Sequence, residues 1–160
     1  MLLSKRRLVF AILVGAVLST GLCVPFYISQ NAWIEWVNPY WFMQLQAARV
    51  ETGHFPSPFI NATSSGWLYP NNLFYAGIEI GIMGSLAAIT DAWSVFVGSI
   101  WMDYFLTFLS ISYIGSLLTR RIGVSALAGL TVITTPYWVT NIYGRGAWAE
   151  LMGASATCMV

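Results

Sequence analysis

The feature that most constrains this chain is an uncharged apolar stretch, Leu8 to Ile28, that directly follows Lys5, Arg6 and Arg7. At ~1.5 Å per helical residue, this stretch spans ~30 Å, the thickness of the hydrocarbon core of a bilayer. Basic residues before a span stay in the cytoplasm. The stretch therefore predicts a transmembrane helix whose amino end is cytoplasmic. A cleaved signal peptide is the alternative, but its apolar region would be shorter and Leu22-Cys23-Val24-Pro25 is a poor cleavage site.

The composition agrees with insertion in a membrane. Hydrophobic residues make up 58% of the 160 residues and charged residues only 8%, whereas soluble domains carry about 25% charged residues. The net charge of +1 indicates no nucleic-acid partner. One His and scattered carboxylates lack the spacing of metal ligands, so the residues themselves predict no metal site. Cys23 and Cys158 lie in apolar stretches and are interpreted as small hydrophobic residues.

Further apolar segments follow at residues 73–89, 93–118 and 123–142, and residues 29–72 form a long loop before them. The pattern predicts an all-α fold of several transmembrane helices, with spans at about 8–28, 93–118 and 123–142. Residues 73–89 are short, rich in glycine and carry Glu79, so this segment is either spanning or re-entrant. Its expected packing face consists of small residues at four-residue spacing: Gly77, Gly81 and Ser85.

The long loop contains a predicted amphipathic helix. Pro39 is well placed to start it, and Gly53 to end it. Trp41, Leu45 and Ala48 would share one apolar face of this helix. We therefore expect a juxtamembrane helix that lies on the outer leaflet.

Arg120 and Arg121 discriminate between two topologies. If every apolar segment crosses, both arginines lie outside, against the tendency of basic residues to stay in the cytoplasm. If residues 73–89 do not cross, residues 93–118 run inward and both arginines are cytoplasmic. Arg145 and Glu150 then share the outer side with the long loop. We favour this second topology.

The carboxyl end lies inside an apolar run, at Cys158-Met159-Val160, with no helix stop and no polar tail. We therefore expect residues 1–160 to be the N-terminal part of a longer multi-spanning domain, truncated at 160. A truncated gene product or a misplaced end of the reading frame would look the same.

Charged residues on the expected outer side are candidates for a site at the membrane surface. Arg145 is flanked by glycines, which would let the backbone approach a ligand closely. An arginine can also hold a phosphate with two hydrogen bonds. The alternative is an ordinary loop charge, with Glu150 in the first turn of the next helix, where the helix dipole favours it. His54 is interpreted from the residues alone as an ordinary exposed loop histidine.

Asp103 lies near the middle of its predicted span. A carboxylate at the bilayer centre costs roughly 2.5–3.5 kcal/mol on insertion scales. It must therefore face a partner or water. A functional site and a polar partner on a helix beyond this chain are both consistent with its position.

The order of motifs resembles the C-type (GT-C) membrane glycosyltransferases, and in particular bacterial membrane proteins labelled as related to 6-pyruvoyl-tetrahydropterin synthase. The likeness covers almost the whole chain, and its most specific part is an Arg-Gly-Ala-x-Ala-Glu motif. The matching segments are Arg49-Val50 with Gly53-His54-Phe55-Pro56, Leu68-Tyr69-Pro70 with Leu73-Phe74-Tyr75, Tyr113 with Arg120-Arg121, and Pro136-Tyr137 with Arg145 to Glu150.

One departure from this family concerns the acid of the first outer loop. The related proteins have an Asp just before the amphipathic helix and a His one turn later. Here Asn38 stands near the Asp position and no His follows. An Asn cannot accept a proton, so Glu35 would have to substitute, or the chain uses a different acid or is inactive.

The resemblance implies transfer of a sugar from a polyprenyl-phosphate donor to a glycan, lipid or protein acceptor on the outer face of the cytoplasmic (inner) membrane. It implies no certain cofactor and allows a divalent metal. From the residues alone, two non-enzymatic alternatives stay open: a transporter or flippase part that uses Asp103 and Glu79, and an assembly subunit. The residues that the resemblance assigns are Glu35, Asn38 and Glu150 for catalysis, and Arg49, Arg145, His54, Trp36 and Trp41 for substrate binding.

Overall fold

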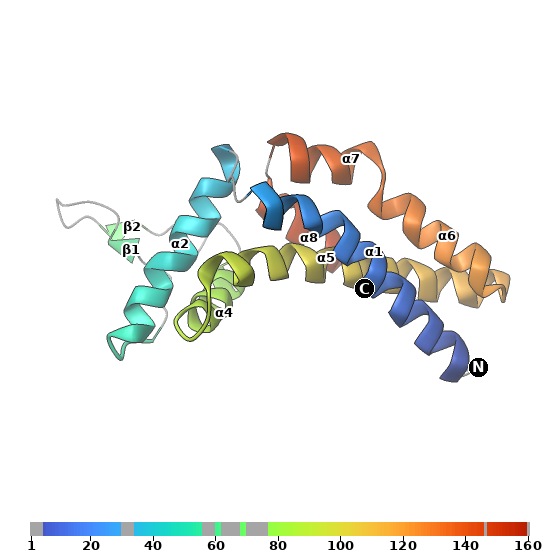
Figure 1. Ribbon diagram of the computed structural model, residues 1–160, viewed down its shortest axis with the longest axis horizontal. Helices are drawn as coiled ribbons and strands as arrows, with labels where there is room; N and C mark the ends of the chain where they lie inside the picture. The colour runs from blue at the N-terminus through green and yellow to red at the C-terminus, as the bar shows by residue number, and fades with distance from the viewer. Residues whose placement is uncertain are drawn as a thin grey trace. The chain divides into compact units, whose positions relative to one another are not determined.

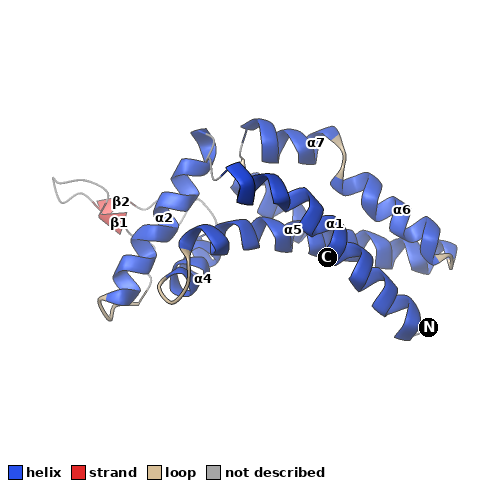
Figure 2. Ribbon diagram, in the orientation of Figure 1, coloured by secondary structure: helices blue, strands red, loops and turns tan. Residues whose placement is uncertain are grey.

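The computed structural model describes residues 5–29, 34–55, 60–61, 68–69, 77–145 and 147–159 (Figure 1). These residues are predominantly helical, as Figure 2 shows, which confirms the expected helical fold class. The exception is a short antiparallel pair of strands, β1 (Ile60–Asn61) and β2 (Leu68–Tyr69). The helices are α1 (Lys5–Ser29), α2 (Ile34–Glu51), α4 (Gly77–Ala87), α5 (Ala92–Thr119), α6 (Ile122–Ile133), α7 (Pro136–Val139), the π-helix η1 (Thr140–Arg145) and α8 (Trp148–Met159).

Two of the described helices are long and apolar enough to cross a membrane: Arg6–Ser29 within α1, and α5. A third candidate is a bent pair, Ile122–Ile133 with Pro136–Tyr143, whose axes differ by 44°. The bend falls just before Pro136, which cannot donate a backbone hydrogen bond into the preceding turn. Within the described residues, helix α4 has 11 residues, or ~17 Å at 1.5 Å per residue, which is less than the thickness of the hydrocarbon core.

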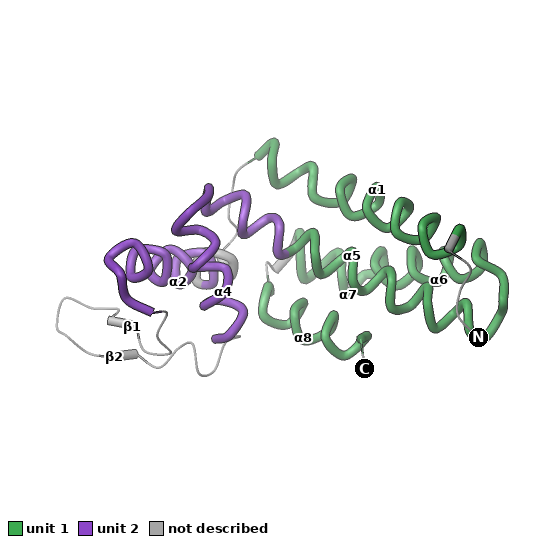
Figure 3. The backbone as a smooth tube through the Cα atoms, turned by 90° about the horizontal axis from the view of Figure 1, so that it is seen from below, with its two compact units in different colours: residues 1–31, 100–160 green, residues 32–99 purple. Residues whose placement is uncertain are grey.

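The chain divides into two compact units (Figure 3). Unit 1 comprises residues 1–31 and 100–160, and unit 2 comprises residues 32–99. Helix α5 begins in unit 2 and continues in unit 1. Each unit is described by itself below.

In unit 1, α1 and α5 run antiparallel. Near the carboxyl end of α1, the Trp101 indole Nε1 donates a hydrogen bond to Thr20 Oγ1 at 3.1 Å. Midway along α1, Gly15 lies against the rings of Phe105 and Phe108. At the amino end, the Arg7 guanidinium donates to the backbone carbonyl of Arg120 at 3.4 Å. The amino end of α1 therefore lies beside the turn that joins α5 to α6, as Figures 1 and 3 also show.

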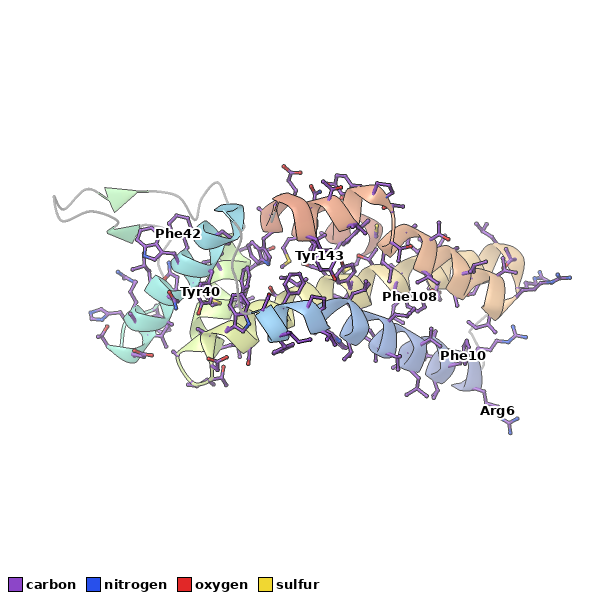
Figure 4. All side chains as sticks on the ribbon, turned by 45° about the horizontal axis from the view of Figure 1, so that its top comes forward. Arg6, Phe10, Tyr40, Phe42, Phe108 and Tyr143 are labelled. Atoms are coloured by element: carbon purple, nitrogen blue, oxygen red, sulfur yellow. The ribbon has the colours of Figure 1, made fainter. Side chains whose placement is uncertain are left out.

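Helices α5 and α6 form a hairpin that small residues hold close together. Around Gly115, the backbone and side chain of Ser125 lie within 3.5 Å of where a Cβ atom would be. Gly129 is still tighter, because a Cβ there would meet Ser112 Oγ at 2.5 Å and the Phe108 carbonyl at 2.9 Å. Such small-residue contacts let helix backbones approach in a lipid environment. The Phe108 ring fills the space between α1 and α6 (Figure 4).

The opposite end of unit 1 is closed by the segment that follows α7. The Tyr143 hydroxyl donates a hydrogen bond to the carbonyl of Leu22 in α1. Its ring stacks on Phe26, with the ring centroids 5.2 Å apart. Figure 4 shows Arg6 at one end of α1 and Tyr143 toward the other. This end of unit 1 therefore contains the carboxyl end of α1, the first residues of α5 that belong to unit 1, and η1.

In unit 2, α2 packs against α4 along a face that differs from the expected one. The buried residues of α4 are Ile80, Met83, Gly84 and Ala87, and not Gly77, Gly81 and Ser85, which are half-buried. The expected small-residue face was wrong because apolar residues are distributed all around α4, whose one charged residue, Glu79, is half-buried, so its sequence does not single out one face. Gly84 makes the close contact: a Cβ there would lie 2.4 Å from Gln46 Cβ.

Helix α2 begins at Ile34 rather than at Pro39, which lies inside it. Its buried residues are Phe42, Met43, Gln46 and Ala47. Trp41 and Ala48, from the apolar face expected to lie on the outer leaflet, are exposed, and Leu45 is half-buried. An apolar face left open in this way is compatible with contact to lipid.

The amino end of α5 is capped by Asp91. The Ser94 backbone N–H donates to Asp91 Oδ2 at 2.7 Å, and the Val95 N–H donates to the Asp91 carbonyl at 3.1 Å. This is the geometry of an N-cap residue. Hydrogen bonds from the Ser94 backbone and side chain lower the pKa of the exposed Asp91 carboxyl below its usual value. Beside the cap, Tyr40 packs edge-on against Trp93 and Phe96.

Candidate functional site

The carboxyl end of α2 brings Arg49 and His54 together. Gly53 adopts a left-handed conformation, with φ of 80°, and the chain closes the helix with a Schellman motif. The His54 N–H donates to the Arg49 carbonyl at 3.0 Å, and the Gly53 N–H donates to the Val50 carbonyl at 2.9 Å. Glycine is the usual residue at this position because it has no Cβ to oppose a positive φ.

The Thr52 hydroxyl reinforces this end of the helix. It donates to the Arg49 carbonyl at 2.8 Å, and its Oγ1 lies 3.2 Å from His54 Nδ1. His54 is exposed, as expected for a loop histidine. The same hydroxyl thus contacts the Arg49 carbonyl and the His54 imidazole.

The Arg49 side chain is half-buried, and its Nε is buried without a hydrogen-bond partner among the described residues. A buried donor without a partner is costly, roughly 1–3 kcal/mol. Arginine in this state is suited to an oxyanion that approaches from outside the helix. Arg49 and His54 therefore form the best-defined pair among the expected substrate-binding residues.

Other expected residues of this unit are only partly described. Trp41 is 39% exposed and packs at a tilt on Phe42, with centroids 5.1 Å apart. Glu35, Trp36 and Asn38 lie within the backbone of α2, but their side chains are outside the described residues. The expected choice between Glu35 and Asn38 as the acid position therefore stays a prediction.

The Arg-Gly-Ala-x-Ala-Glu motif lies in unit 1, at the junction of η1 and α8. Arg145 ends the π-helix η1, and its side chain is outside the described residues. The Ala147 N–H donates to the Asn141 carbonyl at 2.8 Å, which closes the wide turn. Glu150 is exposed in the first turn of α8, where the helix dipole favours a carboxylate. Short π-helical segments are rare and often occur at functional sites, and no pattern in the sequence indicated this one.

Unit 1 also buries a polar cluster that centres on Asp103. The Ser155 hydroxyl of α8 donates to Asp103 Oδ1 at 2.7 Å, and both residues are buried. Cys23 of α1 lies near this carboxyl group. The partner that the sequence required for Asp103 is thus within this chain. Cys23 and Cys158 are free, in agreement with their interpretation as small apolar residues.

Further polar groups lie buried in the same unit. Several of them have no hydrogen-bond partner among the described residues. Thr107 follows Asp103 by one helical turn, so that its position on the Asp103 face was readable from the sequence. The burial of the other groups was not predictable from the sequence. These groups are the hydroxyls of Ser19, Thr107 and Ser112 and the amide nitrogen of Asn141.

Within the described part of the chain, no three His, Cys, Asp or Glu residues lie close enough together to hold a metal ion. The described candidate residues lie at two places: the end of α2 in unit 2, and the start of α8 in unit 1. Compared with known protein families, curated proteins and solved structures, the chain has no match.

Proposed function

We propose that this chain contributes to a membrane glycosyltransferase that transfers a sugar from a polyprenyl-phosphate donor to an acceptor on the outer face of the cytoplasmic membrane. The motif order described above is the basis for the family. The observation that carries the proposal is the position of the Arg145–Glu150 motif. The motif lies at the end of unit 1 where α1 ends. The hydrogen bond from Tyr143 to Leu22 identifies this end. The loop that begins after α1 therefore starts at the same end as the motif.

The proposal includes a topology with a cytoplasmic amino terminus. Two facts support it. Arg7 contacts the turn that carries Arg120 and Arg121, so the basic residues of both segments gather at one end. Also, α1 and α5 are antiparallel, so the chain between them leaves and returns at the same end, and α4 is too short to cross. Residues 77–87 are then embedded in or lie on the outer leaflet.

In the proposed reaction, a carboxylate removes a proton from the acceptor hydroxyl as that oxygen attacks the sugar. Glu35 is the proposed base, with Asn38 as a binding group and Glu150 as the second acid. Arg145 is proposed to hold the departing phosphate and stabilise its growing negative charge, and Arg49 is proposed to bind substrate. The remaining proposed roles are contacts to phosphate by His54 and to the lipid or sugar by Trp36 and Trp41.

The test is the amount of glycan made by cells that carry Arg145→Ala or Glu35→Gln, with membrane insertion followed by immunoblotting of membrane fractions. Both variants are expected to insert normally and to lose the glycan. Glu79→Gln is the matched comparison, because it removes a carboxylate of α4 that has no role in the proposed chemistry. Unchanged glycan in both Arg145→Ala and Glu35→Gln would contradict the proposal.

A second candidate function is transport of a polar solute or headgroup. The buried Asp103–Ser155 pair and the hydroxyls around it favour this candidate, because a polar interior is typical of pathways through membrane bundles. It predicts that Asp103→Asn abolishes activity while Arg145→Ala preserves it. The glycosyltransferase proposal predicts the opposite order, so that the same panel of variants separates the two.

A further inference from the structure

One end of unit 1 gathers four exposed arginines from two distant parts of the sequence. Arg6 and Arg7 belong to the first turn of α1, and Arg120 and Arg121 form the turn between α5 and α6. The hydrogen bond from Arg7 Nη1 to the Arg120 carbonyl joins residues that are 113 positions apart. We refer to these four residues as the arginine cluster. The cluster concentrates positive charge at one end of unit 1, and this charge attracts an anionic partner.

The acidic residues of unit 1 do not supply that partner. Its sequence contains Asp103 and Glu150, and neither belongs to the segments that meet at this end. Asp103 is bonded to Ser155, near Cys23, and Glu150 lies in the first turn of α8, just past the η1 end. The partner of the arginine cluster must therefore come from outside unit 1.

The backbone of the turn is also arranged for an anion. Arg121 is the N-cap residue of α6, and no side chain caps that helix. Gly123, in the first turn of α6, is exposed and has open space where a Cβ would lie. Uncapped N–H groups at a helix start attract negatively charged oxygen atoms. They add to the guanidinium groups, which carry the main attraction.

Arg120 occupies a conformation that suits glycine better. Its φ is 57°, and a residue with a Cβ loses roughly 1–2 kcal/mol in the left-handed region. The Thr119 and Ser125 hydroxyls hold the turn through the Arg121 backbone. The strained turn thus presents two adjacent arginines. A glycine in place of Arg120 would relieve the strain but would remove one positive charge.

Exposed apolar side chains border the arginine cluster. Leu118 is 80% exposed, Val124 is 48% exposed and Leu8 is 47% exposed. Cationic groups next to exposed apolar side chains match a phospholipid, whose phosphate lies above its acyl chains. A free phosphate would use the arginines but leave the apolar side chains without a contact.

We propose that the arginine cluster binds the headgroups of anionic phospholipids, with Leu8, Leu118 and Val124 in contact with their acyl chains. The guanidinium groups hold the phosphate oxygens, and the start of α6 contributes backbone N–H groups. This proposal concerns lipid binding and does not depend on the proposed glycosyltransferase. It adds a physical reason for this end of unit 1 to face the leaflet that carries more anionic lipid.

The test is native mass spectrometry of the full chain, purified in detergent and incubated with equal amounts of phosphatidylglycerol and phosphatidylcholine. The wild type is expected to retain phosphatidylglycerol in preference. Replacing all four arginines with Gln is expected to remove the preference, with a loss on the order of fivefold for each arginine. The control variant replaces the same four residues with Lys, which keeps the charge and should keep most of the preference.

Three outcomes would overturn the proposal: a wild type that binds both lipids equally, a glutamine variant that keeps the preference, or full displacement of the lipid by an equal concentration of glycerol phosphate, which has no acyl chains. If the glutamine variant does not fold, the salt dependence of the wild type decides. A site built from four cations must lose its preference as NaCl is raised, so a preference that does not change with salt contradicts the arginine cluster.

Discussion

Unit 1 and unit 2 both bring two helices together through a glycine, but they complete the contact in different ways. In unit 2, Gly84 of α4 lies against Gln46, the Met43 carbonyl and the Ala47 nitrogen of α2. In unit 1, Gly129 of α6 lies against Ser112 and Phe108 of α5. Unit 1 then adds hydrogen bonds between helices, such as Asp103 with Ser155, whereas unit 2 buries Phe42, Met43, Ile80 and Met83.

The difference indicates how each unit holds its helices. Lipid tails are as apolar as a leucine side chain, so that apolar contact alone gives little drive for helices to associate in a membrane. Close packing and interhelical hydrogen bonds replace it. Unit 1, which contains most of the long apolar helices, uses both. Among the described residues, unit 2 shows close packing and contacts between aromatic rings, including Tyr40 against Trp93 and Phe96.

The strongest test of the comparison is alanine in place of each glycine. Gly84→Ala puts a Cβ 2.4 Å from Gln46 Cβ, which is attached to the α2 backbone and cannot move alone. Gly129→Ala meets Ser112 Oγ at 2.5 Å, which can rotate, and Phe108 atoms at 2.9 Å. We expect a loss of about 3 kcal/mol of unfolding free energy for Gly84→Ala and about 2 kcal/mol for Gly129→Ala, measured by denaturation in detergent.

Matched controls exist in both units. A Cβ at Gly98 in unit 2 or at Gly153 in unit 1 would have no atom within 4 Å. Gly98→Ala and Gly153→Ala are therefore expected to be neutral, or to stabilise by up to about 1 kcal/mol through helix propensity. Equal losses at Gly84 and Gly98 would show that close approach does not hold α2 to α4.

The next largest effect is expected at the buried hydrogen bond of unit 1. Ser155→Ala removes the donor to Asp103 Oδ1 and leaves a buried carboxyl group with one partner fewer. We expect a loss of about 2 kcal/mol, within the range for leaving a buried polar group without its hydrogen bond, from the same denaturation measurement. Thr157→Ala on the exposed side of α8 is the control and should change stability by less than about 0.5 kcal/mol. If Ser155→Ala were as stable as Thr157→Ala, the hydrogen bond to Asp103 would not contribute to the difference between the two units.

A smaller effect is expected where α1 meets α5. Trp101→Phe keeps the aromatic ring but removes the donor to Thr20 Oγ1. Hydrogen bonds between membrane helices contribute about 0.6 kcal/mol on average, and we expect a loss of this size. Thr20→Val removes the same bond from the other side, so the double variant should lose no more than either single one. Additive losses would mean that the two residues do not interact.

The smallest effect is expected from pH at the start of α5. The pKa of Asp91 is lowered in the folded chain by its hydrogen bonds to Ser94. Its cap therefore stabilises the fold above the unfolded-state pKa of about 3.9, and this contribution is lost as pH falls through the lower folded-state value. Unfolding followed between pH 2 and pH 6 should show this decline in the wild type. The Asp91→Asn variant should lack the part of the stability loss that comes from the Asp91 cap. An identical pH profile in both proteins would mean that other groups cause the loss.

The candidate site was predictable only in part. The end of α2 at Gly53 and the position of Glu150 in a first helical turn follow from local rules for helix ends, and both were predicted. The backbone hydrogen bond between His54 and Arg49 belongs to a Schellman motif, which the glycine at position 53 indicates. In contrast, the face of α4 was wrong, because a helix that is apolar on every side carries no pattern to mark its partner. The π-helix before Arg145 had no signal in the residues.

The sequence by itself determined that this chain forms long apolar helices, because length, hydropathy and helix-ending residues act within a few turns of the chain. It also determined that Asp103 needs a partner, since a carboxyl group in an apolar span is costly wherever it lies. Only the tertiary structure decided that the partner is Ser155, 52 residues away, and that Arg7 meets the turn at Arg120. These contacts depend on how helices pack, and packing energy is shared among many alternative faces that local sequence does not distinguish.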